Sequence, residues 1–544
     1  MKSAHDEATK ACDRSDALLE CSVAEVTREL VRGTMSRRQV LRWIGGLLAG
    51  AVLARFPGSA SAARVGGLTE LGVPLQHGVQ FRGLLLPTKN RSLEGRFGLM
   101  FKELPAFEPP DELLSGLAAS MEEPGEAPPS VTDAPRFPAG HVLLGQFIDH
   151  DLTFDNTPLP EQREDPNART NFRSARFDLD SLYGVGPNVS PELYSRNDSA
   201  KLRITGLDDP VTPDDLPRRS DGKAIIGDPR NDENLIICQL HLAFMKFHNA
   251  LVDHVRAQGR RGVDKVFQDA QRLCRWHYQW MAVHDFLPRV VGQNVVDSIL
   301  EERADVPAMV RLDFYKPENP KKPMMPIEFA VAAYRFGHSM LRPTYVINEQ
   351  GGDAVLFGEQ PTDFNLNGSR PCPPRLVIAW RHFFDIPGVA DPPANDARRI
   401  DSDLSLPLFT LPASVVPQPD THVSLAERNL LRGKRLGLPS GQQVAQKMGL
   451  EALSNNQLGL GDDAGWEGQA PLWFYILKEA ELQHDGERLG AVGGRIVAEI
   501  FLGLLTLDKN SYLSQDPPWR PEPPIAGTVG RFEIGDLLKF AGVA

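Results

Sequence analysis

The sequence predicts a mainly α-helical protein with one large hydrophobic core, long ordered loops and little β structure. The first observation is periodicity, because apolar residues recur three and four positions apart in six stretches: 232–258, 263–301, 325–341, 442–450, 470–482 and 493–506. The second is that convincing alternating strands are scarce. The third is composition, since 544 residues with 41% apolar content suffice for a large buried core.

The order of these stretches suggests three parts. An N-terminal extension with an export signal covers 1–62, a loop-rich segment covers 63–139, and the predicted catalytic domain covers 140–544. Segments rich in Pro and in acidic residues predict long ordered loops at 104–140, 156–170 and 206–230. No internal repeat is present.

The N-terminal part carries the sequence MSRRQVLRWIGGLLAGAVLARFPGSASA at 35–62. Its paired arginines, its short apolar run and its final Ala-Ser-Ala resemble a twin-arginine export signal with a cleavage site. We therefore expect a periplasmic or extracellular protein, and translation can start at Met1 or at Met35. The alternative is an ordinary surface helix with a basic end. The apolar run is too short to span a bilayer, so no stable membrane span is expected.

Charge and cysteine content narrow the function classes. The formal net charge of -12 argues against general nucleic-acid binding, which needs a basic face. Three of the five cysteines, Cys238, Cys274 and Cys372, follow the presumed signal and lie far apart. They predict neither a disulfide framework nor a cysteine metal site.

The first polar cluster is GQFIDHDLTF, within a helix expected at 141–152. Gln146 and His150 are four residues apart and share a helix face, whereas Asp149 and Asp151 point about 100° to either side. An imidazole and an amide facing one cavity suit proton transfer to a small polar ligand. A carboxylate on the flank suits a cation or covalent attachment. The alternative is a solvated, charged helix end.

The second cluster is GDPRNDEN at 227–234. Asp232 is expected to cap the following helix, and Arg230 and Glu233 can share a face at the start of that helix. The plainer alternative is a charge pair that complements the helix dipole. His241 and His248 lie two turns apart, too far to chelate one ion, and are expected to be packing histidines.

Two further clusters remain open on their own. His338 lies in the apolar stretch AAYRFGHSMLRPTYV, where a lone histidine is usually a core residue but is also a good ligand for haem iron. The stretch SARFDLDSLYG offers hydroxyl, carboxylate and carbonyl oxygens for a hard cation, without the spacing of an EF-hand; a surface turn is the alternative.

Together, and in this order, the clusters resemble the animal-type haem peroxidases of the peroxidase-cyclooxygenase superfamily, in its bacterial branch. The resemblance covers about 140–510. GQFIDHDLTF is similar to the family's distal-helix motif, which implies His150 as distal histidine, Gln146 as its cavity partner and Asp149 as a carboxylate that forms an ester to haem. GDPRNDEN is similar to the catalytic-arginine motif, which implies Arg230 as that arginine and Glu233 as the second ester-forming carboxylate.

The later motifs complete the resemblance. YRFGHSMLRP implies His338 as the axial iron ligand, and SLAERNLLRGKRLGLPSG implies that Asn429 orients its imidazole, with Arg432 near a haem propionate. Arg335 is also assigned to the haem site. The calcium ligands implied are Asp151, Ser174, Arg176 through its carbonyl, Asp178 and Asp180. The Arg-Asp-His-Gly sequence frequent after the asparagine helix is Lys-Arg-Leu-Gly here, which leaves that loop without a predicted role.

The activity implied is reduction of hydrogen peroxide by haem b, with oxidation of small organic donors and of halides as a further option. A fatty-acid dioxygenase of the same superfamily is the first alternative, but it carries a radical tyrosine three residues before the proximal histidine, where this chain has Arg335. Tyr334, one residue further back, would point about 100° away. A non-catalytic calcium-binding relative is the second alternative. The oligomeric state is not predicted.

Overall fold

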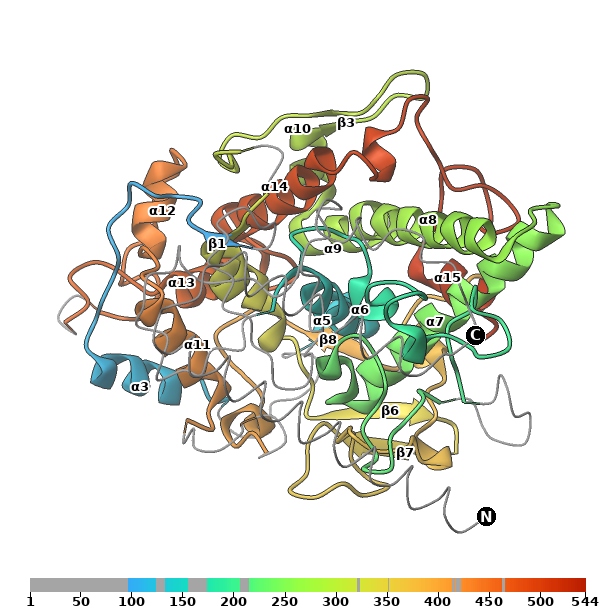
Figure 1. Ribbon diagram of the computed structural model, residues 1–544. Helices are drawn as coiled ribbons and strands as arrows, with labels where there is room; N and C mark the ends of the chain where they lie inside the picture. The colour runs from blue at the N-terminus through green and yellow to red at the C-terminus, as the bar shows by residue number, and fades with distance from the viewer. Residues whose placement is uncertain are drawn as a thin grey trace, which may run out of the picture. The chain divides into compact units, whose positions relative to one another are not determined.

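The computed structural model describes residues 96–123, 133–154, 174–205, 215–319, 323–350, 352–412, 416, 422–461 and 465–544, with only the backbone described at 133–136. All of them belong to one compact unit, Pro74–Ala544. The predicted export signal, the loop at 156–170 and residues 206–214 lie outside the described residues. The prediction of a mainly α-helical fold is confirmed (Figure 1).

Helices form most of the described chain. They are α3 (Asp111–Ser120), α5 (Gly140–Leu152), α6 (Asp180–Tyr183), α7 (Leu235–Ala257), α8 (Val263–Met281), α9 (Leu287–Val291), α10 (Gln293–Ile299), α11 (Leu425–Arg435), α12 (Gly441–Lys447), α13 (Leu472–His484), α14 (Ala491–Leu507) and α15 (Ile534–Phe540). The tighter or wider turns that matter below are η5 (Pro229–Asp232), η6 (Ala282–Phe286), η7 (Glu328–Ala332), η8 (Ala333–His338) and η12 (Tyr512–Ser514).

The described strands are short and pair two by two. Parallel β1 (Phe97–Gly98) and β5 (Met325–Pro326) form one pair; antiparallel pairs join β2 (Asp133–Pro138) to β8 (Asp396–Arg398), β3 (Leu300–Glu301) to β4 (Met309–Val310), and β6 (Thr344–Asn348) to β7 (Gly352–Val355). The first two pairs connect distant segments of the chain, whereas β3–β4 and β6–β7 are local hairpins. Through β1 and β2, residues 97–138 are joined to the rest of the compact unit.

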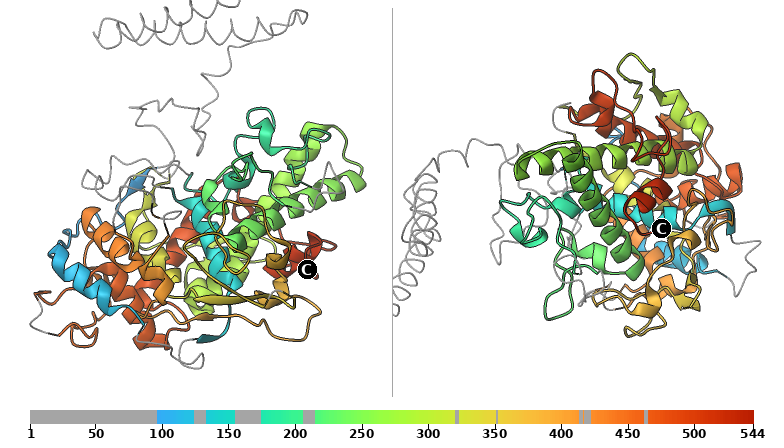
Figure 2. Two further views of the ribbon diagram at one scale, coloured as in Figure 1. Left: turned by 90° about the horizontal axis from the view of Figure 1, so that it is seen from below. Right: turned by 90° about the vertical axis from the view of Figure 1, so that its right-hand side faces the viewer.

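The core packs around α5, α7, α8, α13 and α14. Helices α7 and α8 lie side by side, as Figure 2 shows. Helix α7 is long and apolar enough to cross a membrane, and no other helix in the described part of the chain is. Because 89% of its most apolar window is buried inside the protein, it serves as a core helix.

A buried carboxylate and a close glycine contact hold in place two of the helical segments beside the candidate site. Glu328, at the start of η7, is fully buried and accepts hydrogen bonds from the backbone N–H groups of Met100 and Phe101, both within 3.0 Å. Gly140 begins α5 where an added Cβ would meet the Phe383 carbonyl oxygen at 2.4 Å, so the helix start fits closely against that segment. These contacts fix η7 and α5 relative to the core.

Three local predictions differ from the structure. The loop prediction for 104–140 is wrong at α3, a ten-residue helix packed on α11. The stretch 325–341 is not a regular α-helix, because η7 has π-type turns and η8 has 3-10 turns. Asp232 does not cap α7; Asn234 does, accepting a hydrogen bond from the Ile236 N–H at 2.9 Å, because Asp232 instead pairs with Arg218.

Candidate active site

A cavity with two lobes lies between α5, η5, η8 and α11. The apolar lobe, of roughly 1080 Å³, and the polar lobe, of roughly 960 Å³, include solvent space at their openings. Both lobes are lined by the same central residues: Gln146, Asp149, His150, Glu233, Arg335, His338 and Leu425. The structure therefore brings the predicted distal and proximal residues together around one cavity.

His150 is held in one tautomer by a residue that the sequence analysis did not single out. Its Nδ1 lies 2.7 Å from Oδ1 of buried Asn231. Since this oxygen only accepts, Nδ1 carries the proton and Nε2 keeps its lone pair. The Nδ2 group of Asn231 in turn donates to Nδ1 of His241 at 3.0 Å, which gives that predicted packing histidine a supporting role.

Burial keeps the His150 imidazole neutral. It lowers the pKa of His150 to about 4, and the positive charge of Arg230 acts in the same direction. The charges of Asp228 and Asp149 and the hydrogen bond to Asn231 oppose this only in part. At neutral pH the ring is therefore a base that can accept a proton at Nε2.

Arg230 reaches the polar lobe from η5. Its Nη2 donates to Oδ2 of Asp228 at 2.7 Å and to the carbonyl oxygen of His150 at 2.9 Å, and its guanidinium stacks on Phe154. No hydrogen-bond partner is found for its Nη1 among the described residues. The same side chain therefore fixes the end of α5 and presents an N–H group to the cavity.

The two predicted ester-forming carboxylates both line the cavity. Burial raises the pKa of Glu233 to about 7, opposed by Arg230 and assisted by Asp228 and Asp232. A large share of Glu233 is therefore protonated at neutral pH. Asp149 lies one turn before Thr153, whose hydroxyl donates to Asp149 Oδ1 at 2.8 Å.

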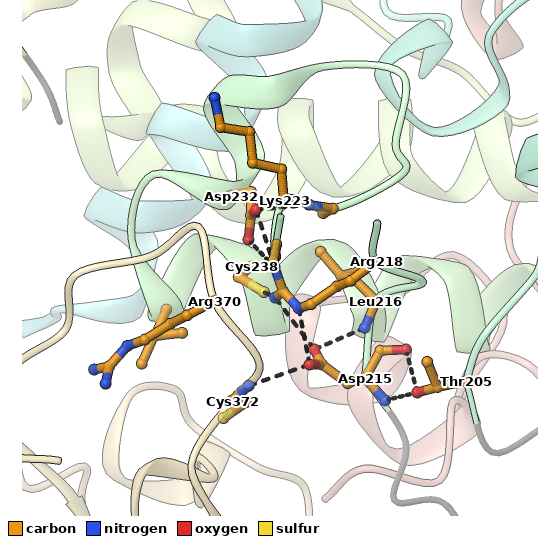
Figure 3. A network of polar contacts seen from close by, with 12 residues as sticks. Thr205, Asp215, Leu216, Arg218, Lys223, Asp232, Cys238, Arg370 and Cys372 are labelled. Carbon is orange, nitrogen blue, oxygen red and sulfur yellow. Dashed lines mark hydrogen bonds and ion pairs between the residues drawn. The ribbon is translucent and has the colours of Figure 1, made fainter. Parts of the chain in front are cut away.

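A buried charge network surrounds Asp232, the neighbour of Glu233 in the chain (Figure 3). Arg218 Nη1 donates to both oxygens of Asp232 at 2.9 and 3.0 Å, and its Nε donates to Asp215 at 3.1 Å. The Asp215 carboxylate also accepts from the backbone N–H of Cys372 at 3.1 Å. The network joins three chain segments beside the turn that carries Arg230 and Glu233.

On the opposite side, His338 ends η8 and contacts the amide of Asn429 on α11, whose Nδ2 lies 2.7 Å from His338 Nδ1. With Nδ2 in this position the amide donates to Nδ1; if His338 held a metal through Nε2, its proton would lie on Nδ1, and the amide would turn its Oδ1 toward the ring to accept it. Burial lowers the pKa of His338 to about 3, assisted by the charges of Arg335 and Arg432. The imidazole is therefore neutral, as a metal ligand must be.

Arg335 and Arg432 supply positive charge at the cavity. Arg335 lines both lobes and Arg432 lines the polar lobe, which Arg230 also lines. The Nε of Arg335 donates to the carbonyl oxygen of Ala330 at 2.9 Å. The donor set fits haem: a neutral histidine on each side, apolar walls at one end, and arginines at the other for the propionates.

Three of the predicted calcium ligands gather beside α5. Carboxylate oxygens of Asp151, Asp178 and Asp180 all lie within 4.8 Å of one another, and Asp151 and Asp180 are buried. Ser174 is close, since its hydroxyl donates to Asp178 Oδ2 at 2.8 Å. Three carboxylates this close repel one another unless a cation joins them, and an all-oxygen set suits calcium. Arg176 lies in the same loop.

Tyr334 also lines the cavity. Because η8 has 3-10 turns, Arg335 and His338 are one turn apart and both line the cavity. The Tyr334 ring, predicted to point about 100° away from the direction of Arg335, forms part of the apolar lobe. It stacks on Phe329 with ring centroids 4.6 Å apart.

The supporting residues Asn231, Asp228 and Arg218 were missed in the sequence. A signal for two of them was present, because Asn231 and Asp228 lie within the GDPRNDEN motif beside Arg230. Arg218 is twelve residues before Arg230 in a polar loop and carries no local signal. Only the folded chain places it next to Asp232.

Comparisons with known proteins identify the family of the chain. Residues 146–458 match the family "Animal haem peroxidase". A peroxidase-like protein of Margaritifera margaritifera is 28% identical over 187 residues, covering 32% of this chain and 22% of the relative. Thyroid peroxidase of Rattus norvegicus is 24% identical over 325 residues, covering 56% of this chain and 33% of the relative. The matched part of the chain thus spans a third or less of these relatives' length.

Solved structures show the same fold. Peroxidase A of Dictyostelium discoideum superposes with a TM-score of 0.55 at 16% identity, covering 78% of this chain and 88% of that chain. A fatty acid alpha-dioxygenase of Arabidopsis thaliana gives a TM-score of 0.51 at 14% identity, covering 80% and 74%. Because the family match covers more than half of the chain and contains His150, Arg230 and His338, the chain belongs to the animal haem peroxidase family.

Proposed function

We propose that the protein is a haem-dependent peroxidase that reduces hydrogen peroxide and oxidises small organic donors. The observation that carries the proposal is the tautomer of His150. Asn231 Oδ1 accepts a hydrogen bond from the Nδ1–H group, so the basic Nε2 is available in the cavity that His338 also lines. Family membership implies haem, and the donor set of the cavity fits it.

The residues of the cavity then have defined roles. His338 would hold the haem iron, with its ring oriented by Asn429, while Arg335 and Arg432 would face the propionates. Bound haem would supply redox-active iron that can store the two oxidising equivalents of the peroxide. His150 Nε2 takes a proton from hydrogen peroxide and returns it to the departing oxygen, and Arg230 stabilises the negative charge that develops there. Gln146, one turn before His150, helps to position the peroxide.

Two carboxylates support a covalent attachment of haem. Asp149 and Glu233 line the cavity at its centre, and the raised pKa of Glu233 keeps much of this carboxyl neutral near pH 7. A neutral carboxyl is less costly to bury than an ionised one before an ester forms. We propose ester links through both residues.

Calcium is the second proposed cofactor. Asp151, Asp178 and Asp180, with Ser174 and the Arg176 carbonyl, would tie the loop at 174–180 to the end of α5. Because Asp151 directly follows His150, a cation there would also hold the distal turn in place. Removal of calcium should therefore affect both stability and the reaction with peroxide.

Export and halide oxidation are further parts of the proposal. The twin-arginine-type signal supports a periplasmic or extracellular location, and the positive charges of Arg230, Arg335 and Arg432 are compatible with a halide near the cavity. A fatty-acid dioxygenase is the second candidate, and the observation in its favour is that Tyr334 lines the apolar lobe. Consumption of oxygen with a fatty acid and without peroxide would support this candidate.

The test uses the purified full chain reconstituted with haem. We expect a Soret band that His338→Ala abolishes, and a rapid spectral change on mixing with hydrogen peroxide that His150→Ala slows while the Soret band remains. His382→Ala is the matched control, because this histidine pairs with Glu349 near the surface. Failure of the wild-type protein to bind haem, or an unchanged peroxide rate in His150→Ala, would refute the proposal.

A further inference from the structure

A second pocket lies at the surface, formed by the ends of α7 and α8 and by the segment 518–525. Its lining includes His254, His277, Trp519, Arg520 and Glu522. None of these residues belongs to the haem cavity. The pocket therefore is a separate feature of the molecule.

His277 is the unusual member of this pocket. It is 1% exposed, and its Nδ1 donates to the carbonyl oxygen of Leu273 at 2.7 Å, which leaves Nε2 as an acceptor. Nε2 is buried and has no hydrogen-bond partner among the described residues. Burial lowers the pKa of His277 to about 4, so this lone pair is present at neutral pH. A buried acceptor without a partner is costly, and an O–H or N–H group of a ligand would satisfy it.

Oxidisable rings begin at the same pocket and continue inward. The centroid of the Trp519 ring lies 5.0 Å from the ring centroid of His277 and 5.3 Å from that of Trp276. The ring centroids of Trp280 and Tyr512 both lie 6.2 Å from it. We call Trp276, Trp280, Tyr512 and Trp519 the aromatic cluster. Trp and Tyr are the side chains that lose an electron most readily, so four such rings in contact can share an oxidising equivalent.

Tyr512 also has the partner that a tyrosine needs when it is oxidised. Its hydroxyl lies 3.0 Å from Nε2 of His284, and the same nitrogen lies 3.3 Å from Oε2 of Glu302, so the phenolic proton has acceptor groups beside it as the electron leaves. The His284 ring stacks on Trp280 with centroids 3.9 Å apart. Proton and electron can therefore both move within the cluster.

Further rings connect α8 to the haem cavity. Tyr278 lies two residues before Trp280 and 6.0 Å from Phe177, which lies 5.0 Å from Phe501. Phe501 lies 5.5 Å from Tyr334, the ring in the wall of the apolar lobe. Because electron tunnelling slows steeply with distance, the oxidisable rings of Trp280, Tyr278 and Tyr334 divide one long transfer into shorter ones, while Phe177 and Phe501 pack between them without being oxidised.

We propose that the pocket at Trp519 binds a bulky aromatic electron donor, a phenol or an aromatic amine, and that the aromatic cluster carries its electron toward the haem cavity. This inference rests on the proposed peroxidase function, which supplies the oxidant. Trp519 gives one electron inward to the peroxide-oxidised cofactor and takes one electron from the donor. The donor loses its O–H or N–H proton to water at the opening of the pocket as its electron leaves. Two donor molecules, each losing one electron and one proton, complete one peroxide turnover.

The first test compares two donors on the haem-loaded full chain: free phenol, which can enter the haem cavity, and dextran carrying phenol groups, which cannot. We expect Trp519→Phe to lower kcat/KM for the dextran donor by about tenfold or more, while the rate of reaction with hydrogen peroxide stays unchanged. Trp380→Phe is the matched control, a buried tryptophan outside the pocket and the cluster. Equal dextran-donor turnover in Trp519→Phe and wild type would overturn the inference.

Two other measurements separate binding from electron transfer. His277→Phe keeps an aromatic ring but removes the acceptor, so it should weaken binding of the dextran donor to the resting enzyme, whereas Trp280→Phe should leave binding intact and slow oxidation. Freeze-quenched wild-type enzyme with peroxide and no donor should show a Trp or Tyr radical by electron paramagnetic resonance, reduced in Trp280→Phe. An identical radical in that variant would overturn the relay. Loss of the peroxide reaction in the wild type would instead refute the proposed peroxidase function.

Discussion

Replacing Asn231 by aspartate tests the distal site most directly. In the native protein, Oδ1 of Asn231 lies 2.7 Å from Nδ1 of His150. The change keeps an oxygen in this position but gives it a negative charge. An adjacent carboxylate stabilises the imidazolium, so we expect the pKa of His150 to rise. As the pH falls, the ring would then become protonated at a higher pH than in the wild type, and a protonated ring cannot accept the proton of the peroxide.

The size of the effect follows from the surroundings. Burial sets the His150 pKa at about 4, and an opposite charge this close raises a pKa by about 1 to 3 units. The acid limb of the peroxide reaction should therefore move from near pH 4 to between about pH 5 and 7. Asn231→Leu separates charge from orientation, because it removes the acceptor without adding a charge. It should slow the reaction by roughly 10²-fold to 10⁴-fold across the pH range.

The assay is the second-order rate of the spectral change on rapid mixing with hydrogen peroxide, measured as a function of pH. Asn455→Asp is the control, because Asn455 is also buried and hydrogen-bonded but lies outside the haem cavity. An acid limb that stays near pH 4 in Asn231→Asp would show that His150 is not the proton acceptor, or that Asn231 does not set its protonation.

Four further outcomes are expected. Arg230→Ala should retain the Soret band and react with peroxide about 10²-fold to 10³-fold more slowly, and a near-normal rate on rapid mixing would contradict its role. Arg218→Met should lower the free energy of unfolding by about 3 to 5 kcal/mol in urea titrations, because Asp232 and Asp215 both lose their cationic partner. Adding Asp232→Asn should restore part of this loss, and no recovery would argue against charge compensation. Asp178→Ala should abolish any shift in Tm caused by calcium, so an equal calcium effect in wild type and variant would remove the proposed site. Burial lowers the pKa of His248 to about 4, below that of a histidine in the unfolded chain, so the unfolded state binds more protons. The free energy of unfolding should therefore fall by up to about 3 kcal/mol as the pH is lowered from 6.5 to 4. His248→Gln should flatten this pH dependence, and an unaltered profile would contradict it.

Local patterns in the sequence predicted much of the helical framework. The stretch at 141–152 becomes α5, and 232–258 and 493–506 become α7 and α14 within a few residues. These segments follow the sequence because amphipathic periodicity and helix caps act over neighbouring residues. The prediction failed at α3, where a Pro- and Glu-rich context hid a short helix that packs on α11.

In the candidate site, too, the sequence predicted some features and left others to the folded structure. Motif order in the sequence named His150, Arg230, Glu233, His338 and Asn429, and the structure brings all of them to one cavity or its support. Which nitrogen of His150 carries the proton depends on Asn231, 81 residues away. A hydrogen bond of this kind depends on how η5 packs against α5, and no local pattern encodes it.

By itself, the sequence determined the helical class of the protein and the residues that carry its candidate chemistry, because periodicity and motifs are properties of adjacent positions. Only the tertiary structure decided the partners that control their protonation and charge: Asn231 for His150, Arg218 for Asp232, and the placement of Tyr334 in the cavity wall. The physical reason is that burial and contacts between distant segments set a pKa or a side-chain direction, and both arise only when the chain packs.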